Sequence, residues 1–216
     1  MSPNAYSNFG PAWCEAIIDE LNGVAFEVGI ESDKKHRGSA VNVDVMDCDE
    51  PQKLFVMQVR KTDFRPGRFS RTRKDYFLCG RNENGNVFAH PVNVISTNAN
   101  VTTALCRIWN VTPSILPKIV RQGDVAVIPE RGVTFKDVEP LPAMEFTVDS
   151  ATASHIFTPG AIYAKGTTFY VAGSIQIRHE KGQHPFVSAA LDPRKLYRVQ
   201  VGIRASTWGF ARPTAD

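Results

Sequence analysis

The sequence predicts a mainly β protein, with one helix on an antiparallel sheet in the N-terminal half, a short helical connector and a small C-terminal β-barrel or sandwich. Apolar side chains that alternate with polar ones, as at Val41, Val43 and Val45, are typical of half-buried strands. After Arg121, turn residues separate short apolar segments at even spacing, as they do in all-β domains. Only two regions carry apolar residues at helical spacing.

The first predicted element is a helix over 11–21, in which apolar residues recur every four positions from Trp13 to Leu21. Pro11 suits the first helical position. The segment NENG at 82–85 predicts a hairpin, because Asn-Gly readily takes positive φ. Strands are predicted at 24–30, 40–47, 53–60, 74–79 and 86–90.

Residues 98–121 predict two short helices, which are capped by Asn100 and Thr112. Two short helices joined by a tight turn are also the pattern of a helix-turn-helix motif. However, Pro117 stands inside the second helix, where it would interrupt helical hydrogen bonding. We therefore expect a helical connector between two β-rich halves.

The C-terminal half predicts a series of strands with turns between them. These strands are expected at 124–129, 144–148, 154–158, 161–164, 167–172, 174–179, 185–190 and 196–203. The predicted organisation is a basic α+β domain at 1–98, a helical connector at 99–121 and an all-β domain at 122–216.

Composition restricts the class of protein. Apolar residues make up 43% and charged residues 22% of the chain, which is globular composition and excludes a disordered chain. No apolar run approaches the ~20 residues of a membrane span, and the first residues lack the features of a signal peptide. We expect a cytoplasmic protein with no membrane partner. Reduced thiols are expected because the cysteines are widely scattered, at Cys14, Cys48, Cys79 and Cys106.

Positive charge is concentrated in the segment RKTDFRPGRFSRTRKDYF at 60–77, which holds seven Arg and Lys against two Asp. Cations neutralise phosphates, and aromatic rings stack on unpaired bases. The pattern therefore predicts nucleic-acid binding, with RNA favoured because its bases are often unpaired. The alternatives are a protein partner or an acidic surface, and a solvated basic loop with no specific partner, whose aromatic side chains face the core. The residues expected to contact nucleic acid are Arg60, Lys61, Arg65, Arg68, Phe69, Arg71, Arg73, Lys74 and Tyr76.

A weaker alternative concerns Asp44, Gln58 and Arg60, whose order resembles the carboxylate and (E/Q)-x-K core of restriction-type nucleases. Such a core needs clustered carboxylates for magnesium and a lysine beside the attacking water. Here glutamine replaces a common glutamate and arginine stands where lysine is expected. Solvent exposure is the better explanation of Asp44.

Three histidines of the C-terminal half form the second candidate site. His155 lies in a predicted strand, and His179 and His184 flank the turn EKGQ, where a hairpin would set them opposite each other. Imidazoles can act as general acid and base in phosphodiester cleavage, or bind a divalent metal with a nearby carboxylate. The spacing H-x4-H is not a specific metal motif, and a purely structural role is the alternative.

The C-terminal half also resembles a group of small uncharacterised bacterial and phage proteins. The resemblance covers about the last 95 residues and rests on RQGDVAVIP (121–129), TASHIF (152–157), RHEKGQHPFVS (178–188) and LYRVQV (196–201). Those proteins carry a QGDV strand, a GHAH-like strand with two histidines, a closer histidine pair and a YRV strand. The resemblance implies no activity, but it implies one functional cluster of Gln122, Asp124, His155, His179 and His184.

The sequence leaves three functions open. It favours a nucleic-acid-binding protein, and a sharper form of this hypothesis makes it a His-dependent nuclease or phosphodiesterase. The second is a metal-dependent enzyme that acts on a small molecule, with a divalent metal at His155, His179 and His184. The third is a structural or adaptor module whose histidines are inert.

Overall fold

The protein folds as two compact units in a computed structural model. The residues that it describes are 6–8, 10–22, 29–32, 38–64, 71–82, 85–142, 144–150, 153–180 and 186–206. Within these ranges the first unit runs to Ile108 and takes in residues 204–206, and the second runs from Trp109 to Ile203. Each unit is built on one largely antiparallel sheet, so the prediction of a mainly β fold is confirmed.

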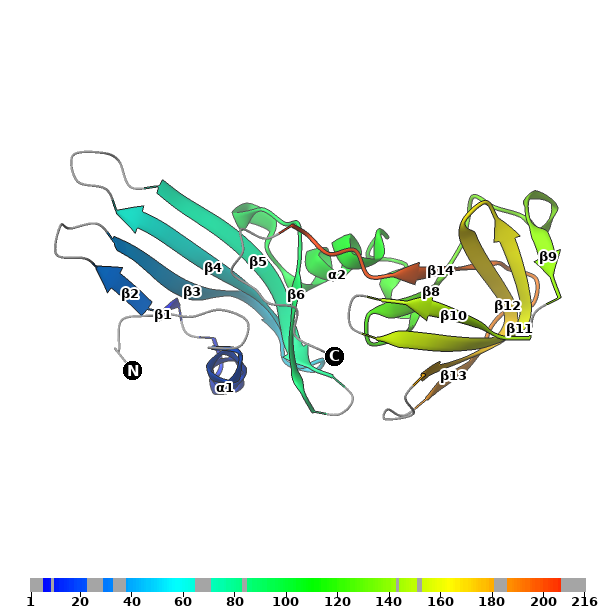
Figure 1. Ribbon diagram of the computed structural model, residues 1–216, viewed down its shortest axis with the longest axis horizontal. Coiled ribbons are helices and arrows are strands. Elements are labelled where there is room, and N and C mark those ends of the chain that lie inside the picture. Colours follow the sequence, from blue (N-terminus) through cyan, green and yellow to red (C-terminus); the bar gives the residue numbers. More distant parts are fainter. Residues whose placement is uncertain are drawn as a thin grey trace. The chain divides into compact units, whose positions relative to one another are not determined.

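In the described chain, the sheet of the first unit has six strands in the order β1–β3–β4–β5–β6, with β2 also paired to β3 (Figure 1). All neighbours are antiparallel except β1 and β3. The central strands extend beyond their apolar segments, because backbone pairing continues through polar residues such as Asn42 and Arg60. The bounds are β1 Tyr6–Asn8, β2 Gly29–Ser32, β3 Gly38–Asp49, β4 Leu54–Phe64, β5 Arg71–Arg81 and β6 Val87–Pro91.

The predicted N-terminal helix is confirmed as α1 (Ala12–Leu21), with Pro11 as its N-cap. Its apolar stripe packs on one face of the sheet, where the Trp13 ring meets the Phe55 ring edge-on at 5.7 Å between centroids. The indole N–H of Trp13 also donates a hydrogen bond to Glu50. The buried side chains of this core are Cys14, Ile17, Ile18, Leu21, Val43, Val45, Phe55, Met57, Val59, Phe77, Cys79 and Ala89.

The second helix, α2 (Val101–Trp109), begins at its predicted cap. The side chain of Asn100 accepts a hydrogen bond from the Thr103 backbone N–H at 2.8 Å, and Asp47 of β3 accepts one from Val101 at 2.9 Å. The prediction of a helix after Thr112 is wrong. Among the described residues this segment forms only a 3-10 helix at Leu116–Lys118, which contains Pro117. A helix-turn-helix motif is therefore ruled out there. Neither α-helix is long and apolar enough to cross a membrane, as far as the chain is described.

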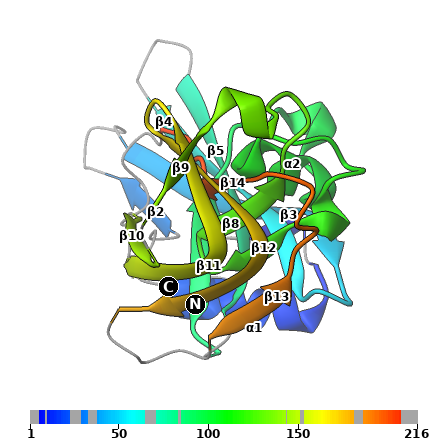
Figure 2. The same ribbon diagram turned by 90° about the vertical axis from the view of Figure 1, so that its right-hand side faces the viewer.

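The described part of the second unit holds an eight-stranded sheet in the order β10–β11–β12–β14–β8–β7, with β9 paired to β11 and β13 to β12. Figure 2 shows the long β11–β12 hairpin curving across this unit. These strands are not closed into a barrel within the described residues. Their bounds are β7 Val120–Gln122, β8 Val125–Pro129, β9 Glu139–Leu141, β10 Phe146–Asp149, β11 Ser154–Lys165, β12 Thr168–His179, β13 Val187–Ala190 and β14 Tyr197–Val201.

Two predicted turns in this unit are wrong, because Pro159–Gly160 and Gly173 lie inside long strands. Pro159 faces Ile175 while Ala161 faces Ala172, so β12 carries one more residue than β11 across this step. Such a bulge needs unusual backbone angles, which Gly173 supplies at a φ of 83°. A Cβ at Gly160 would lie 3.0 Å from the Ser174 Oγ, which explains the second glycine. The proline and glycines that predicted turns therefore belong to a β-bulge in the β11–β12 ladder.

The fold predicts the effect of truncating the core of the first unit. Phe55 is fully buried between the sheet and α1, so Phe55→Ala should lower the free energy of unfolding by about 3–5 kcal/mol. Urea denaturation measured by circular dichroism tests this. The matched control is Phe186→Ala, because that ring is 61% exposed and its loss should cost about 0.5 kcal/mol or less. Equal losses for the two variants would contradict this packing.

Candidate functional site

The basic segment forms the outer half of the β4–β5 hairpin. Its register sets Arg60 opposite Lys74 and, in the next rung, Lys61 opposite Arg73. Side chains directly opposite in an antiparallel pair lie side by side on one face. Two consecutive rungs are therefore like-charged pairs, an arrangement that by itself destabilises a sheet.

The cations divide between the two faces of the hairpin. Val59 and Phe77 face the α1 core, so by alternation Lys61, Arg71 and Arg73 lie on that face of the sheet. Arg60 and Lys74 lie on the opposite face. The hydroxyls of Thr62 and Thr72 meet there at 3.1 Å, which agrees with this assignment. The sequence alone does not show which of these cations share a face.

Arg60 is engaged by a carboxylate within the sheet. Its Nε lies 2.7 Å from one oxygen of Asp44, and its Nη2 donates to the other oxygen at 3.2 Å. The Asp44 side chain is only 14% exposed, so this fork-shaped contact is partly shielded from water. Asp44 thus neutralises Arg60, and the magnesium-binding nuclease core is not assembled: no three His, Cys, Asp or Glu of the described chain gather as metal ligands.

The described aromatic side chains of the hairpin lie inside the fold. Phe77 is 1% exposed and belongs to the α1 core. Tyr76 is 8% exposed on the opposite face, where its hydroxyl accepts a hydrogen bond from Gln58 at 2.9 Å and meets the Ser96 hydroxyl at 2.6 Å. Tyr76 is therefore a fixed part of the protein and not an open platform for stacking bases.

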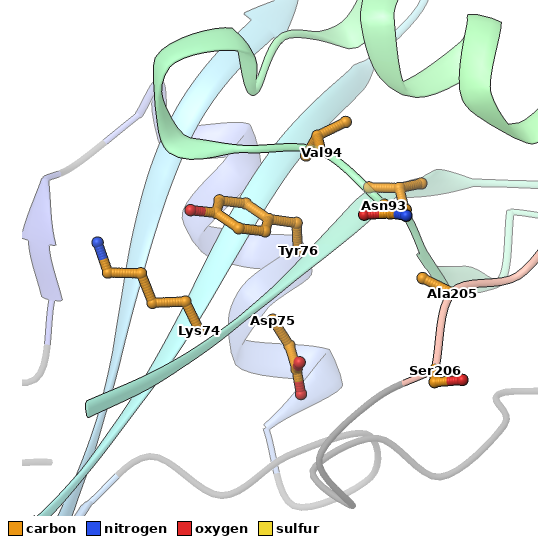
Figure 3. Close-up of a pocket in the computed structure, with 8 residues that line it drawn as sticks. Lys74, Asp75, Tyr76, Asn93, Val94, Ala205 and Ser206 are labelled. Atoms are coloured by element: carbon orange, nitrogen blue, oxygen red, sulfur yellow. The ribbon is translucent and has the colours of Figure 1, made fainter. Parts of the chain in front are cut away.

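A pocket of about 340 Å³ lies next to Tyr76, where β6 leaves β5 (Figure 3). Lys74 and Tyr76 extend from one side of β5 and Asp75 from the other. The chain turns away after Pro91, and Ala205 returns to donate a backbone hydrogen bond to Pro91 at 3.1 Å. The lining residues are Lys74, Asp75, Tyr76, Val92, Asn93, Val94, Ala205 and Ser206.

Four predicted site residues lie outside the described residues. They are Arg65, Arg68, Phe69 and His184.

In the second unit, the structure brings two of the predicted histidines together. His155 of β11 faces His179 of β12 directly, with 4.3 Å between the ring centroids. His155 is fully buried and His179 is 6% exposed. Two rungs further along the same ladder, on the same face, Phe157 pairs with Ile177, and both are core residues. The imidazoles thus form a close, buried pair at the end of an apolar core.

Gln122 and Asp124 flank the tight turn between β7 and β8, where Gly123 has a φ of 54°. Both side chains are buried, at 1% and 5% exposure. The backbone carbonyl of Asp124 accepts a hydrogen bond from Gly202 at 2.7 Å, which fastens the turn to the end of β14. Within the residues that the structure describes, neither carboxylates nor thiols complete a three-ligand metal site with the imidazole pair.

The cysteines divide by burial. Burial raises the pKa of the Cys14 thiol to about 12, and it raises the pKa of Cys79 well above its ordinary value. Burial also raises the pKa of Cys106, which is half-buried. Cys48 is exposed. Since the thiolate is the nucleophile, these shifts disfavour Cys14, Cys79 and Cys106 as catalytic groups.

Sequence reasoning missed the pocket, because its lining comes from three separated segments at 74–76, 92–94 and 205–206. No local pattern links these segments. The strands predicted at 74–79 and 86–90 are nearly equal in length, so the early end of β6 beside the longer β5 is evident only in the structure.

The chain was compared with models of known protein families, with curated proteins and with solved structures, and none of the three comparisons gives a match. The resemblance of the C-terminal half to small bacterial and phage proteins therefore stays a prediction.

The thiols provide a test of the first unit. At pH 8 the Cys14 thiol, with a pKa of about 12, is ionised to only about one part in ten thousand, and burial also raises the pKa of Cys79, so neither should react in the native protein. We expect Cys48 to react first with Ellman's reagent, Cys106 more slowly, and all four after unfolding. The Cys48→Ser variant should lose the fast phase. A fast phase that persists in this variant would show that a buried thiol is accessible.

Proposed function

We propose that the protein binds single-stranded nucleic acid, in the first instance RNA, with the outer half of the β4–β5 hairpin. The observation that carries the proposal is the pair of like-charged rungs, Arg60–Lys74 and Lys61–Arg73, although Asp44 already engages Arg60. Like charges in directly opposed positions cost stability, and phosphates that contact them would relieve the repulsion. Arg71 on the same strand is a further exposed cation, and the register sets it opposite Asp63.

The division of cations between the two faces favours a single strand over a duplex. Lys61, Arg71 and Arg73 are separated from Lys74 by the sheet itself. Among the described residues, β5 is an edge strand over 71–75, because β6 pairs only with Phe77–Arg81. A flexible single strand can pass over this edge and reach both faces, whereas a stiff duplex contacts one face at a time.

Salt dependence of binding tests this proposal. Four cations (Lys61, Arg71, Arg73 and Lys74) that contact phosphates at about 0.7 released counterions each predict a log–log slope near −3 for a single strand. The measurement is fluorescence anisotropy of labelled 12-nucleotide RNA and DNA strands and of a duplex, between about 50 and 300 mM salt. We expect the single strands to bind more tightly than the duplex. A flat slope, or no binding at low salt, would refute the proposal.

Charge reversal locates the contact. The double variant Lys61→Glu with Arg73→Glu should weaken binding by about tenfold or more and flatten the slope by about 1.4. The matched control reverses Arg131 and Lys136, two exposed cations of the second unit, and changes net charge equally. The control should bind nearly as the parent does. Equal weakening in both variants would indicate a general charge effect and no site on the hairpin.

A second candidate function rests on the His155–His179 pair. Two imidazoles whose centroids lie 4.3 Å apart are close enough to share one transition-metal ion or one proton. Their burial disfavours cleavage of a polymer at this point, because a phosphodiester chain has no access to a fully buried ring. It is compatible with a metal-dependent enzyme that acts on a small molecule.

Metal analysis tests this second candidate. A metal-dependent enzyme predicts one transition-metal ion per chain in the purified protein, and loss of the ion in His179→Ala. The melting temperature of the loaded parent should then fall on addition of a chelator. A metal-free parent, whose melting temperature does not respond to zinc or nickel, would rule this candidate out. The control is His90→Ala, which removes a buried histidine of the first unit.

A further inference from the structure

The pocket at the end of β6 has the dimensions of a site for one small polar ligand. Its volume of about 340 Å³ is at the lower end of the range for ligand pockets, roughly 300–1,000 Å³. A single nucleotide fits this range, and a folded partner does not. The pocket lies beside the like-charged rungs of the hairpin, because Lys74 belongs to both.

The floor of the pocket is fixed and its rim is polar. Tyr76, Val92 and Val94 are each less than a tenth exposed. The Tyr76 hydroxyl is held by Gln58 and Ser96, so the ring keeps its place whether or not a ligand is present. The exposed rim offers an ammonium group, a carboxamide and a hydroxyl, on Lys74, Asn93 and Ser206.

The open edge of β5 adds backbone groups to this rim. The Tyr76 carbonyl accepts a hydrogen bond from Val92 at 2.9 Å, so the backbone of Tyr76 is turned toward the β6 side. In an antiparallel ladder, alternate residues turn the same way. Thr72 and Lys74 therefore direct both N–H and C=O away from β4, on a side where no described strand pairs with them.

We propose that this pocket binds one unpaired nucleotide of the strand held by the hairpin. The backbone N–H and C=O of Lys74 form a donor and acceptor pair that matches the Watson–Crick edge of a base, which also carries a donor beside an acceptor. The base occupies the pocket with its edge toward the backbone of Lys74, and the Lys74 ammonium meets the neighbouring phosphate. The inference rests on the proposed function, and it explains why a base in a duplex, whose edge is already paired, would be excluded.

The test compares an intact 8-nucleotide RNA with the same strand carrying one abasic residue at each position in turn, by fluorescence anisotropy. We expect one abasic position to weaken binding by roughly five- to tenfold, and the salt slope to stay unchanged, since no phosphate is lost. In Ala205→Phe, which fills the pocket, the intact strand and the abasic strand should bind alike. Ala205→Ser is the matched control.

A backbone substitution tests the edge contact separately. Lys74→Ala removes the charge, and Lys74→Pro removes the charge together with the outward N–H, at an edge position where proline is tolerated. The proline variant should bind more weakly than the alanine variant by roughly two- to tenfold. Thermal melting of both variants checks that they fold, and the abasic comparison in the parent protein tests the inference even if one of them does not.

The outcomes separate this inference from the proposed function. If binding is tight and salt-dependent but no abasic position weakens it, the inference of a nucleotide pocket is refuted and the hairpin proposal is retained. No binding of any strand would overturn both. An acidic extended peptide could instead pair with the backbone of Thr72 and Lys74. If such a peptide competes with the RNA strand for this edge, the occupant is a peptide and the nucleotide inference is overturned.

Discussion

The ladder between β4 and β5 is the constraint on which the first unit depends. It runs without a register shift from Phe55–Cys79 at one end to Asp63–Arg71 at the other. At the inner end it supplies the apolar face that α1 covers, and at the outer end it carries the cations. Because a slip of one residue would turn Phe55 and Met57 away from α1, the core holds the register for the whole hairpin. The like-charged rungs are thus fixed in place by packing further along the same strands.

The apolar core and the positive charge therefore occupy different lengths of the same two strands. The inner rungs bury aromatic and aliphatic side chains, and the outer rungs oppose cation to cation. Asp44 moderates that repulsion by engaging Arg60 on one face. Lys74 has no such neighbour in its rung, and its backbone faces the open edge. Lys74 thus lies at the open edge beside the pocket, where the shorter β6 has already ended.

In the second unit, strand register likewise brings polar side chains together, here the two imidazoles of His155 and His179. The β11–β12 ladder places His155 against His179, two rungs from the buried pair of Phe157 and Ile177. A bulge at Gly160 and Gly173 lets these strands continue where the chain would otherwise turn. The imidazoles owe their proximity to strand pairing and their burial to the surrounding core. Burial of both rings disfavours contact with a polymer.

The sequence by itself determined many of the described strands, α1 with its apolar stripe, the cap at Asn100 and the hairpin at 82–85, because these depend on local periodicity and turn chemistry. It did not predict β1, β7 or β9, and most of the predicted strand at 24–30 lies outside the described residues. It also located the basic segment and the histidines. Only the tertiary structure decided which cations share a face, that Asp44 engages Arg60, that Tyr76 is buried, and that His155 meets His179. Each of these is a contact across strands, set by register between segments far apart in the chain. The pocket is the extreme case, since it exists only where the end of one strand and two distant segments meet.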